Sequence, residues 1–226
     1  MSDLAQTLSL LQLGDSFFPS GATSFSWGLE TLRADGLVVR AADVEALIEG
    51  QIRHRWASFD RPALIASYRA AGDLDRIADI DREIDAATLA REARDGGRRI
   101  GSALLKVHAG MGTPGAAGYR ERVQRGDACG QMTAVHGLIG HATGLDETAV
   151  CALSAYGLAV GTIGAALRVG LLGHVEGQAI LARMRAVVDE AVASPLPAVD
   201  ACHAYTPMAE IAMMRHETGS GRMFAS

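Results

Sequence analysis

Cysteines and aromatic residues are scarce in this sequence. The 226-residue chain has three cysteines, Cys129, Cys151 and Cys202, and none forms a Cys-x-x-Cys pair. This pattern excludes a disulfide-rich secreted framework and fits a reducing compartment such as the cytoplasm. Aromatic residues make up only 5%, whereas there are 26 glycines. We therefore expect a core of small side chains, which favours closely packed helices over an aromatic-rich β-sandwich.

Lysine is almost absent as well, because Lys106 is the only one among 21 basic residues. A P-loop needs a lysine directly after Gly-x-x-x-x-Gly, and the environment Leu105-Lys106-Val107 excludes one. Gly110–Gly115 matches G-x-G-x-x-G, but it follows a predicted helix instead of a strand, so it does not indicate a dinucleotide site. The formal net charge is −5, and no basic patch indicates nucleic acid as a partner.

The sequence also lacks the residue spacings of common metal and catalytic sites. Neither the HExxH nor the Gly-x-Ser-x-Gly pattern occurs, which argues against a zinc protease and an α/β-hydrolase. Acidic residues recur four apart in segment 73–85, but the arginines among them favour a solvent-exposed helix with ion pairs. A helical metal-dependent hydrolase that uses these acids with His203 or His216 remains the alternative function.

One long uncharged run raises the question of a membrane span. Residues 148–167 carry no charge, and about 20 apolar residues suffice to cross a bilayer. Twelve of these twenty residues are Ala, Gly, Ser or Thr, and neither a cationic cluster nor a tryptophan flanks them. We therefore predict a buried central helix and no membrane association, with a membrane subunit as the other reading. The start of the chain lacks the basic region of a secretory leader.

Hydrophobic residues recur with helical periodicity along nearly the whole chain. The pattern predicts one all-α domain over residues 1–217, a bundle of about eight to ten helices, followed by a mobile tail over residues 218–226. Pro62 should kink or restart a long helix that Asp43 caps, and Thr206-Pro207 should begin a short helix that ends near Arg215. Further helices are expected over residues 4–13, 23–34, 131–143, 146–167 and 170–193, with a short middle helix between the glycine-containing breaks at 110–115 and 125–127. The charged segment 73–100 also has helical spacing of its apolar residues.

Three motifs resemble a known family. Near the start, Leu10–Glu30 reads LLQLGDSFFPSGATSFSWGLE, and near the end Met214–Thr218 reads MRHET with Arg222-Met223-Phe224 beyond it. Between them lie the runs GAALR, which ends at Arg168, and LGH, which begins at Leu172. Together, in this order and spacing, they resemble the urease accessory protein UreF family over nearly the whole chain.

The resemblance implies a function without catalysis. Members of this family are all-α chaperones that form dimers and help deliver nickel to apo-urease. They bridge a urease-binding scaffold protein of the UreD/UreH type and a nickel-carrying GTPase of the UreG type. The resemblance therefore implies a cytoplasmic protein with no tightly bound cofactor, because the partner GTPase holds the nucleotide and the complex handles the nickel. Whether such a protein activates or gates the GTPase stays open.

The same resemblance indicates which residues contact partners. The expected partner-binding residues are Arg168 and two groups at the end of the chain: Arg215, His216 and Glu217, then Arg222, Met223 and Phe224. A second set in the first motif is expected to shape a turn and a close helix crossing, although Glu30 could simply pair with an arginine. This second set consists of Pro19, Gly21, Ser26, Gly28 and Glu30.

Overall fold

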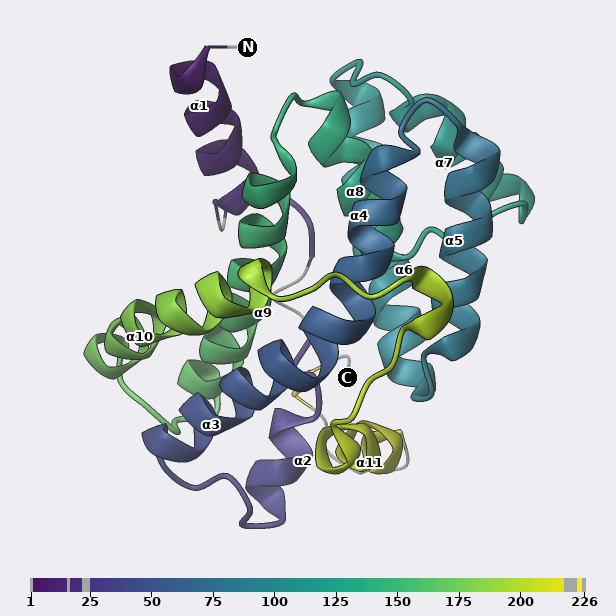
Figure 1. Cartoon of the computed structure of the whole chain (residues 1–226). Helices are drawn as coiled ribbons and strands as arrows, with labels where there is room; N and C mark the ends of the chain where they lie inside the picture. Colours follow the sequence, from purple (N-terminus) through teal and green to yellow (C-terminus); the bar gives the residue numbers. More distant parts are fainter. Residues whose placement is uncertain (1, 16, 22–24, 218–222, 225–226) are drawn as a thin grey trace.

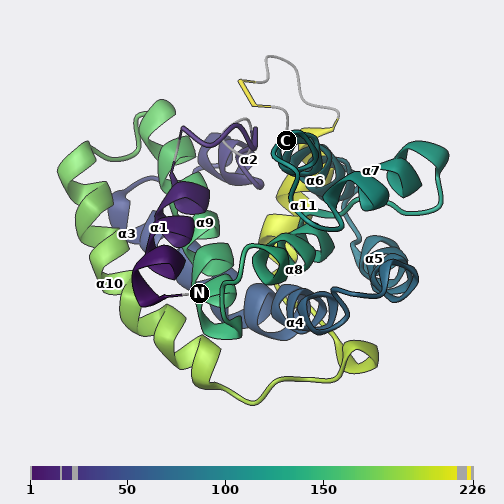
Figure 2. The same cartoon turned by 90° about the horizontal axis from the view of Figure 1, so that it is seen from above.

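The computed structural model describes residues 2–15, 17–21, 25–217 and 223–224. The described part of the chain is helical and contains no strand, as Figures 1 and 2 show. Because α3 and α4 continue into one another, it contains ten separate α-helices, which confirms the predicted all-α bundle. The helices are α1 (Asp3–Gly14), α2 (Leu29–Ala34), α3 (Ala41–Gln51), α4 (Arg61–Arg69), α5 (Leu74–Ala87), α6 (Arg91–Gly110), α7 (Ala116–Arg125), α8 (Met132–Ala142), α9 (Glu147–Arg168), α10 (His174–Ala193) and α11 (Pro207–His216).

A π-helix, Ile52–Asp60, joins α3 to α4 without a break. Pro62 is the second residue of α4, and because proline has no N–H it cannot donate to the carbonyl four residues earlier. That carbonyl, on Ser58, instead accepts the N–H of His203 at 3.1 Å, and the Tyr205 N–H donates to the His54 carbonyl at 2.7 Å. The extended chain before α11 is thereby fixed across the long helix, and Pro62 neither stops nor restarts it.

The central helix of the larger core is α9. It packs against α1, α2, α3, α4, α8, α10 and the π-helix, and small side chains such as Ala155, Ala159 and Ala166 lie in the same buried cluster as Trp56. Among the described helices, α9 is the one long and apolar enough to span a membrane, and 44% of its most apolar stretch is buried inside the protein. Its packing against helices on several sides supports the prediction of a central core helix.

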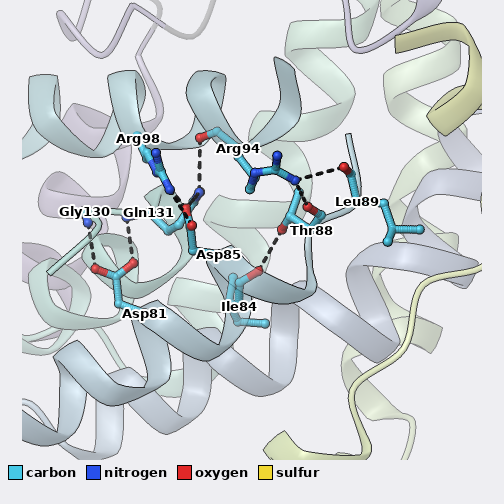
Figure 3. Close-up of polar contacts among 9 residues, drawn as sticks. All are labelled: Asp81, Ile84, Asp85, Thr88, Leu89, Arg94, Arg98, Gly130 and Gln131. Atoms are coloured by element: carbon cyan, nitrogen blue, oxygen red, sulfur yellow. Dashed lines mark hydrogen bonds and ion pairs between the residues drawn. The ribbon is translucent and has the colours of Figure 1, made fainter. Parts of the chain in front are cut away.

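A second core lies between α5, α6, α7 and α8. Figure 3 shows the polar contacts beneath it, where two aspartates of α5 face the chain just before α8. Asp81 accepts hydrogen bonds from the Gly130 N–H at 2.6 Å, the Gln131 N–H at 2.8 Å and the Tyr119 hydroxyl at 2.7 Å. Asp85 accepts from Arg98 at 2.7 Å and from the Gln131 side chain at 2.6 Å. These bonds fix the α7–α8 connection to α5.

Two predicted helix starts are wrong. The helix expected over residues 23–34 begins only at Leu29, because Gly28 adopts a φ of 87° and interrupts it; residues 22–24 lie outside the described part. Asp43 does not precede α3 but is its third residue, where its carboxylate accepts the N–H groups of Val39 and Arg40 at 3.0 and 3.1 Å. Such a carboxylate compensates the unpaired donors at a helix start in the same way as a capping residue.

Candidate partner-binding site

The first and last motifs of the sequence meet where α2 crosses α11, beside the start of α6 (Figure 1). The crossing is close at Gly28, where an added Cβ would lie 2.9 Å from the Ala209 carbonyl oxygen. Gly28 also has a φ of 87°, a conformation that side chains with a Cβ disfavour. The glycine at this position therefore allows α2 and α11 to approach closely, and Ser26, two residues earlier, is buried.

His216 is buried in the crossing between two carboxylates. Its Nδ1 lies 3.0 and 2.9 Å from the two carboxylate oxygens of Glu92, and its Nε2 lies 3.2 Å from Oε2 of Glu30. The side chains come from three helices, since Glu30 is in α2, Glu92 in α6 and His216 in α11. We call these three residues the carboxylate–histidine bridge. It joins parts of the chain that are 186 positions apart in sequence.

Glu92 was not predicted. It is the second residue of α6 and is 8% exposed, yet in the sequence it is one acid in a highly charged segment that resembles a solvated helix face. No spacing links it to Glu30 or His216, so only the folded structure identifies it. Glu30 does not simply pair with an arginine among its described contacts, because it faces a histidine and the end of the chain.

The last described residues are held by Glu30. The Met223 N–H donates to Oε1 of Glu30 at 2.8 Å, and the Phe224 N–H donates to Oε2 at 3.2 Å. The guanidinium carbon of Arg168 lies 4.2 Å from the centre of the Phe224 ring, a favourable cation–π distance. Arg168, Glu30 and Phe224, three of the predicted residues, are thus brought together.

Met223 and Phe224 differ in exposure. Phe224 is only 6% exposed and packs into the α9 core, whereas Met223 is 63% exposed. The burial of Phe224 is not anticipated by the predicted tail over residues 218–226; its ring lies over Arg168 and belongs to the core cluster around α9. Arg222 and the other residues of 218–222 lie outside the described part of the chain.

Arg215 and Glu217 flank His216 and form ion pairs at the surface. Arg215 pairs with Asp35 just beyond α2, with Nη2 at 3.1 Å from Oδ1, and Glu217 pairs with Arg91 of α6 at 2.8 Å. The Arg215 side chain is largely exposed. The Arg-His-Glu triplet is therefore divided: His216 faces the interior, and its two neighbours contribute charge to the rim.

Pro19 and Gly21 belong to a separate turn before the crossing. Phe18, next to Pro19, stacks on His108 of α6 with ring centres 5.5 Å apart. Gly21 has a φ of 70°, so it shapes the turn through its conformation. The turn thus contacts the second core through Phe18.

The geometry does not support a metal-dependent hydrolase. The acids of α5 are engaged in separate contacts, since Asp75 pairs with Arg122, Asp79 with Arg82 and Asp85 with Arg98. Burial raises the pKa of Asp81, although the bonds from Tyr119, Gln131 and Gly130 oppose the shift. Within the described residues, no three His, Cys, Asp or Glu side chains are grouped to hold a metal ion.

Comparison with known proteins shows which family the chain resembles. The UreF family model matches residues 38–185. The urease accessory protein UreF of Trichodesmium erythraeum is 33% identical over 236 aligned residues, which cover 100% of this chain and 99% of the relative. The UreF proteins of Kocuria rhizophila and Actinobacillus pleuropneumoniae serotype 5b are 32% and 29% identical, each over 99% of this chain and over 98% and 100% of the relative. The chain belongs to the UreF family of urease accessory proteins.

Proposed function

We propose that this chain is a non-enzymatic scaffold in urease maturation. It bridges the urease-binding accessory protein of the UreD/UreH type and the nickel-carrying GTPase of the UreG type, so that nickel enters apo-urease. Membership in the UreF family carries the general role in urease maturation. The identity of the partners and the insertion of nickel are the proposed part.

The observation that supports a binding role is the convergence of the two terminal motifs at one surface. The buried side of the α2–α11 crossing is occupied by the carboxylate–histidine bridge, while its rim presents the charged Arg215 and the apolar Met223. Exposed Met and Arg side chains are both enriched at protein interfaces. The rim of the crossing is therefore the proposed contact surface for the accessory partners.

A homodimer is part of the same proposal. Gly157, Gly161 and Gly164 lie along one side of α9, and an added Cβ at any of these glycines would meet open space. A helix of a second copy could approach such a face closely. Gly161→Arg should then shift the isolated chain toward monomer in sedimentation velocity; an unchanged mass would argue against this face.

Nucleotide and metal belong to the partners in this proposal. The sequence has no P-loop lysine, so the isolated chain should neither bind nor hydrolyse GTP. We also expect only weak nickel binding through scattered histidines and cysteines, and a cytoplasmic location. Titration calorimetry with GTP and with nickel tests both expectations, and a stoichiometric submicromolar site for either would contradict the proposal.

The experiment that tests the scaffold role is co-purification of the full chain with the two accessory proteins. Met223→Asp places a charge on the proposed surface, and because Met223 is 63% exposed the change should leave the fold intact. The matched control is Val175→Asp, an apolar position at the start of α10 that is even more exposed, at 83%. Met223→Asp should strongly reduce recovery of the complex and the nickel content of urease, whereas Val175→Asp should not. Equal behaviour of both variants would overturn the proposed surface.

A further inference from the structure

We propose that protonation of His216 controls whether the end of this chain, Met223 and Phe224, stays bound to the α2–α11 crossing. The protonated ring ties Glu92 to Glu30, and Glu30 in turn holds the two terminal amides. Loss of the proton weakens their attachment and partly releases them. This inference concerns the isolated chain, so it goes beyond the proposed function and does not depend on the identity of any partner.

The count of hydrogen-bond donors and acceptors is the first step. A neutral imidazole has one N–H donor and one acceptor, whereas an ionised carboxylate can only accept. Both ring nitrogens of His216 lie within hydrogen-bond distance of a carboxylate, Glu92 on one side and Glu30 on the other. Both contacts are satisfied only when both nitrogens carry a proton, that is, in the imidazolium form. The side chain is 4% exposed, so water cannot easily replace a lost bond.

The second step is which contact is lost when the ring releases a proton. Nδ1 faces both oxygens of Glu92, at 2.9 and 3.0 Å, whereas Nε2 has a single, longer contact of 3.2 Å to Glu30. The remaining proton therefore stays on Nδ1. The lone pair of Nε2 then faces Oε2 of Glu30, and two acceptors in contact repel each other.

The third step is the transmission of this repulsion to the end of the chain. The same Oε2 of Glu30 accepts the Phe224 N–H, and Oε1 accepts the Met223 N–H. A shift of the Glu30 carboxylate away from His216 therefore weakens both backbone bonds together. The remaining contact, the Phe224 ring on Arg168, does not depend on His216 and limits the effect to partial release.

Several other charged groups lie around the bridge in the part of the chain that the structure describes. From α11 and its end, Arg215 pairs with Asp35 and Glu217 pairs with Arg91 of α6, and from α9 Arg168 lies over Phe224. Among these residue types only histidine ordinarily changes charge near neutral pH. The bound form holds one more proton than the released form, so its population falls as pH rises.

The test measures solvent exchange of the Met223 and Phe224 amides by NMR on the full chain between pH 6 and 8, each rate divided by that of an unstructured peptide of the same sequence. A charge-assisted hydrogen bond accounts for about a tenfold change in such an equilibrium. We expect protection to fall by about tenfold across this range, while the ¹⁵N signals of His216 change from the doubly protonated to the singly protonated ring.

Two variants and one control complete the test. His216→Gln and Glu30→Gln each remove one side of the Nε2 contact, so protection of the two amides should no longer depend on pH. His203→Gln changes a histidine that contacts the Ala201 carbonyl outside the crossing, and should behave like the original chain. A neutral His216 ring at pH 6, protection that does not vary with pH, or a pH dependence that persists in both variants would overturn the proposal. The ring signals need no variant, so the test remains decisive even if one variant does not fold.

Discussion

Two regions of the molecule bury histidines in opposite ways. Beside the second core, His108 of α6 is fully buried, and His136 of α8 is half-buried with its Nδ1 inaccessible to solvent; burial lowers the pKa of His108. Burial, with a smaller effect of the neighbouring His108, lowers the pKa of His136 to about 4. At the α2–α11 crossing, His216 is buried as well, but carboxylates lie on both sides of its ring.

The two regions differ in what surrounds the imidazole ring: His108 has no carboxylate among its described contacts, whereas His216 contacts two. His108 donates or accepts one bond, with the Thr113 hydroxyl at 2.9 Å, and a charge on its ring would have no carboxylate to offset it. The folded second core therefore favours the neutral form of the His108 ring. Because acid protonates the ring, low pH should destabilise that core. At the crossing a charged ring completes the contacts, so a rise in pH should loosen the end of the chain.

The largest effect is expected in the second core, at Asp81. Asp81→Ala leaves the Tyr119 hydroxyl and the N–H groups of Gly130 and Gln131 buried without their acceptor. The free energy of unfolding should fall by about 4 kcal/mol, measured by urea denaturation. Tyr119→Phe removes only one of these bonds and should cost about 1 kcal/mol. Similar losses for both variants would mean that the backbone bonds of Asp81 contribute little.

At the crossing, Gly28→Ala should break the contact between α2 and α11. The new Cβ would lie 2.9 Å from the Ala209 carbonyl oxygen, at a residue with a φ of 87°. We expect a loss of about 3 kcal/mol, which combines backbone strain with the displaced helix. Gly36→Ala is the control, because its φ is 72° but nothing lies near its Cβ, and it should cost only about 1 kcal/mol. Equal losses would show that conformation alone, and not the close approach, requires glycine at position 28.

Much of this fold follows from local sequence patterns. The helices α8, α9 and α11 lie within a few residues of the predicted ranges, because apolar periodicity and breakers such as Pro207 act over one or two turns. The π-helix could not be predicted from local sequence patterns. Two of its backbone carbonyls accept hydrogen bonds from the N–H groups of His203 and Tyr205, which are far away in sequence. The sequence of segment 52–60 does not indicate that a distant segment of the same chain donates these hydrogen bonds.

The candidate site could be predicted only in part, for the same reason. The motif residues Gly28, Glu30 and His216 were recognised through resemblance to a family, and the structure places them together. Glu92 was missed because its role depends on how α6 packs against α11. The burial of Phe224 was missed because a Gly-Ser-rich segment precedes it in sequence, whereas its ring contacts Arg168 of α9.

Acid should affect the second core more than the crossing. The pKa of His136 is about 4 in the folded chain and about 6.5 for an ordinary histidine, so the unfolded chain binds more protons below pH 6.5. Stability is therefore retained above that pH and lost as pH falls toward 4. We expect a loss of about 2 kcal/mol from this residue. Urea denaturation of the original chain and of His136→Gln at pH 7 and pH 4.5 measures it.

The variant separates this effect from the protonation of carboxylates, which both chains share. His136→Gln should lose less stability between the two pH values, whereas His203→Gln should lose as much as the original chain. If all three chains lost the same free energy of unfolding between the two pH values, the His136 ring would be solvated in the folded state. His136 would then no longer serve as the comparison for His216.

The smallest effect on overall stability is expected from Phe224→Ala. The ring is buried against Arg168, and a core phenylalanine truncated in this way would cost about 3–5 kcal/mol. Phe224 lies near the end of the chain, however, so the segment can detach while the helices stay folded. The free energy of global unfolding should therefore change by less than about 1 kcal/mol, whereas the Met223 amide should exchange with solvent about tenfold faster. Calorimetry and NMR exchange on the same sample measure the two quantities, with the exposed Met223→Ala as control, which should alter neither. A large drop in melting temperature would instead make Phe224 an integral part of the α9 core and the crossing as rigid as the second core.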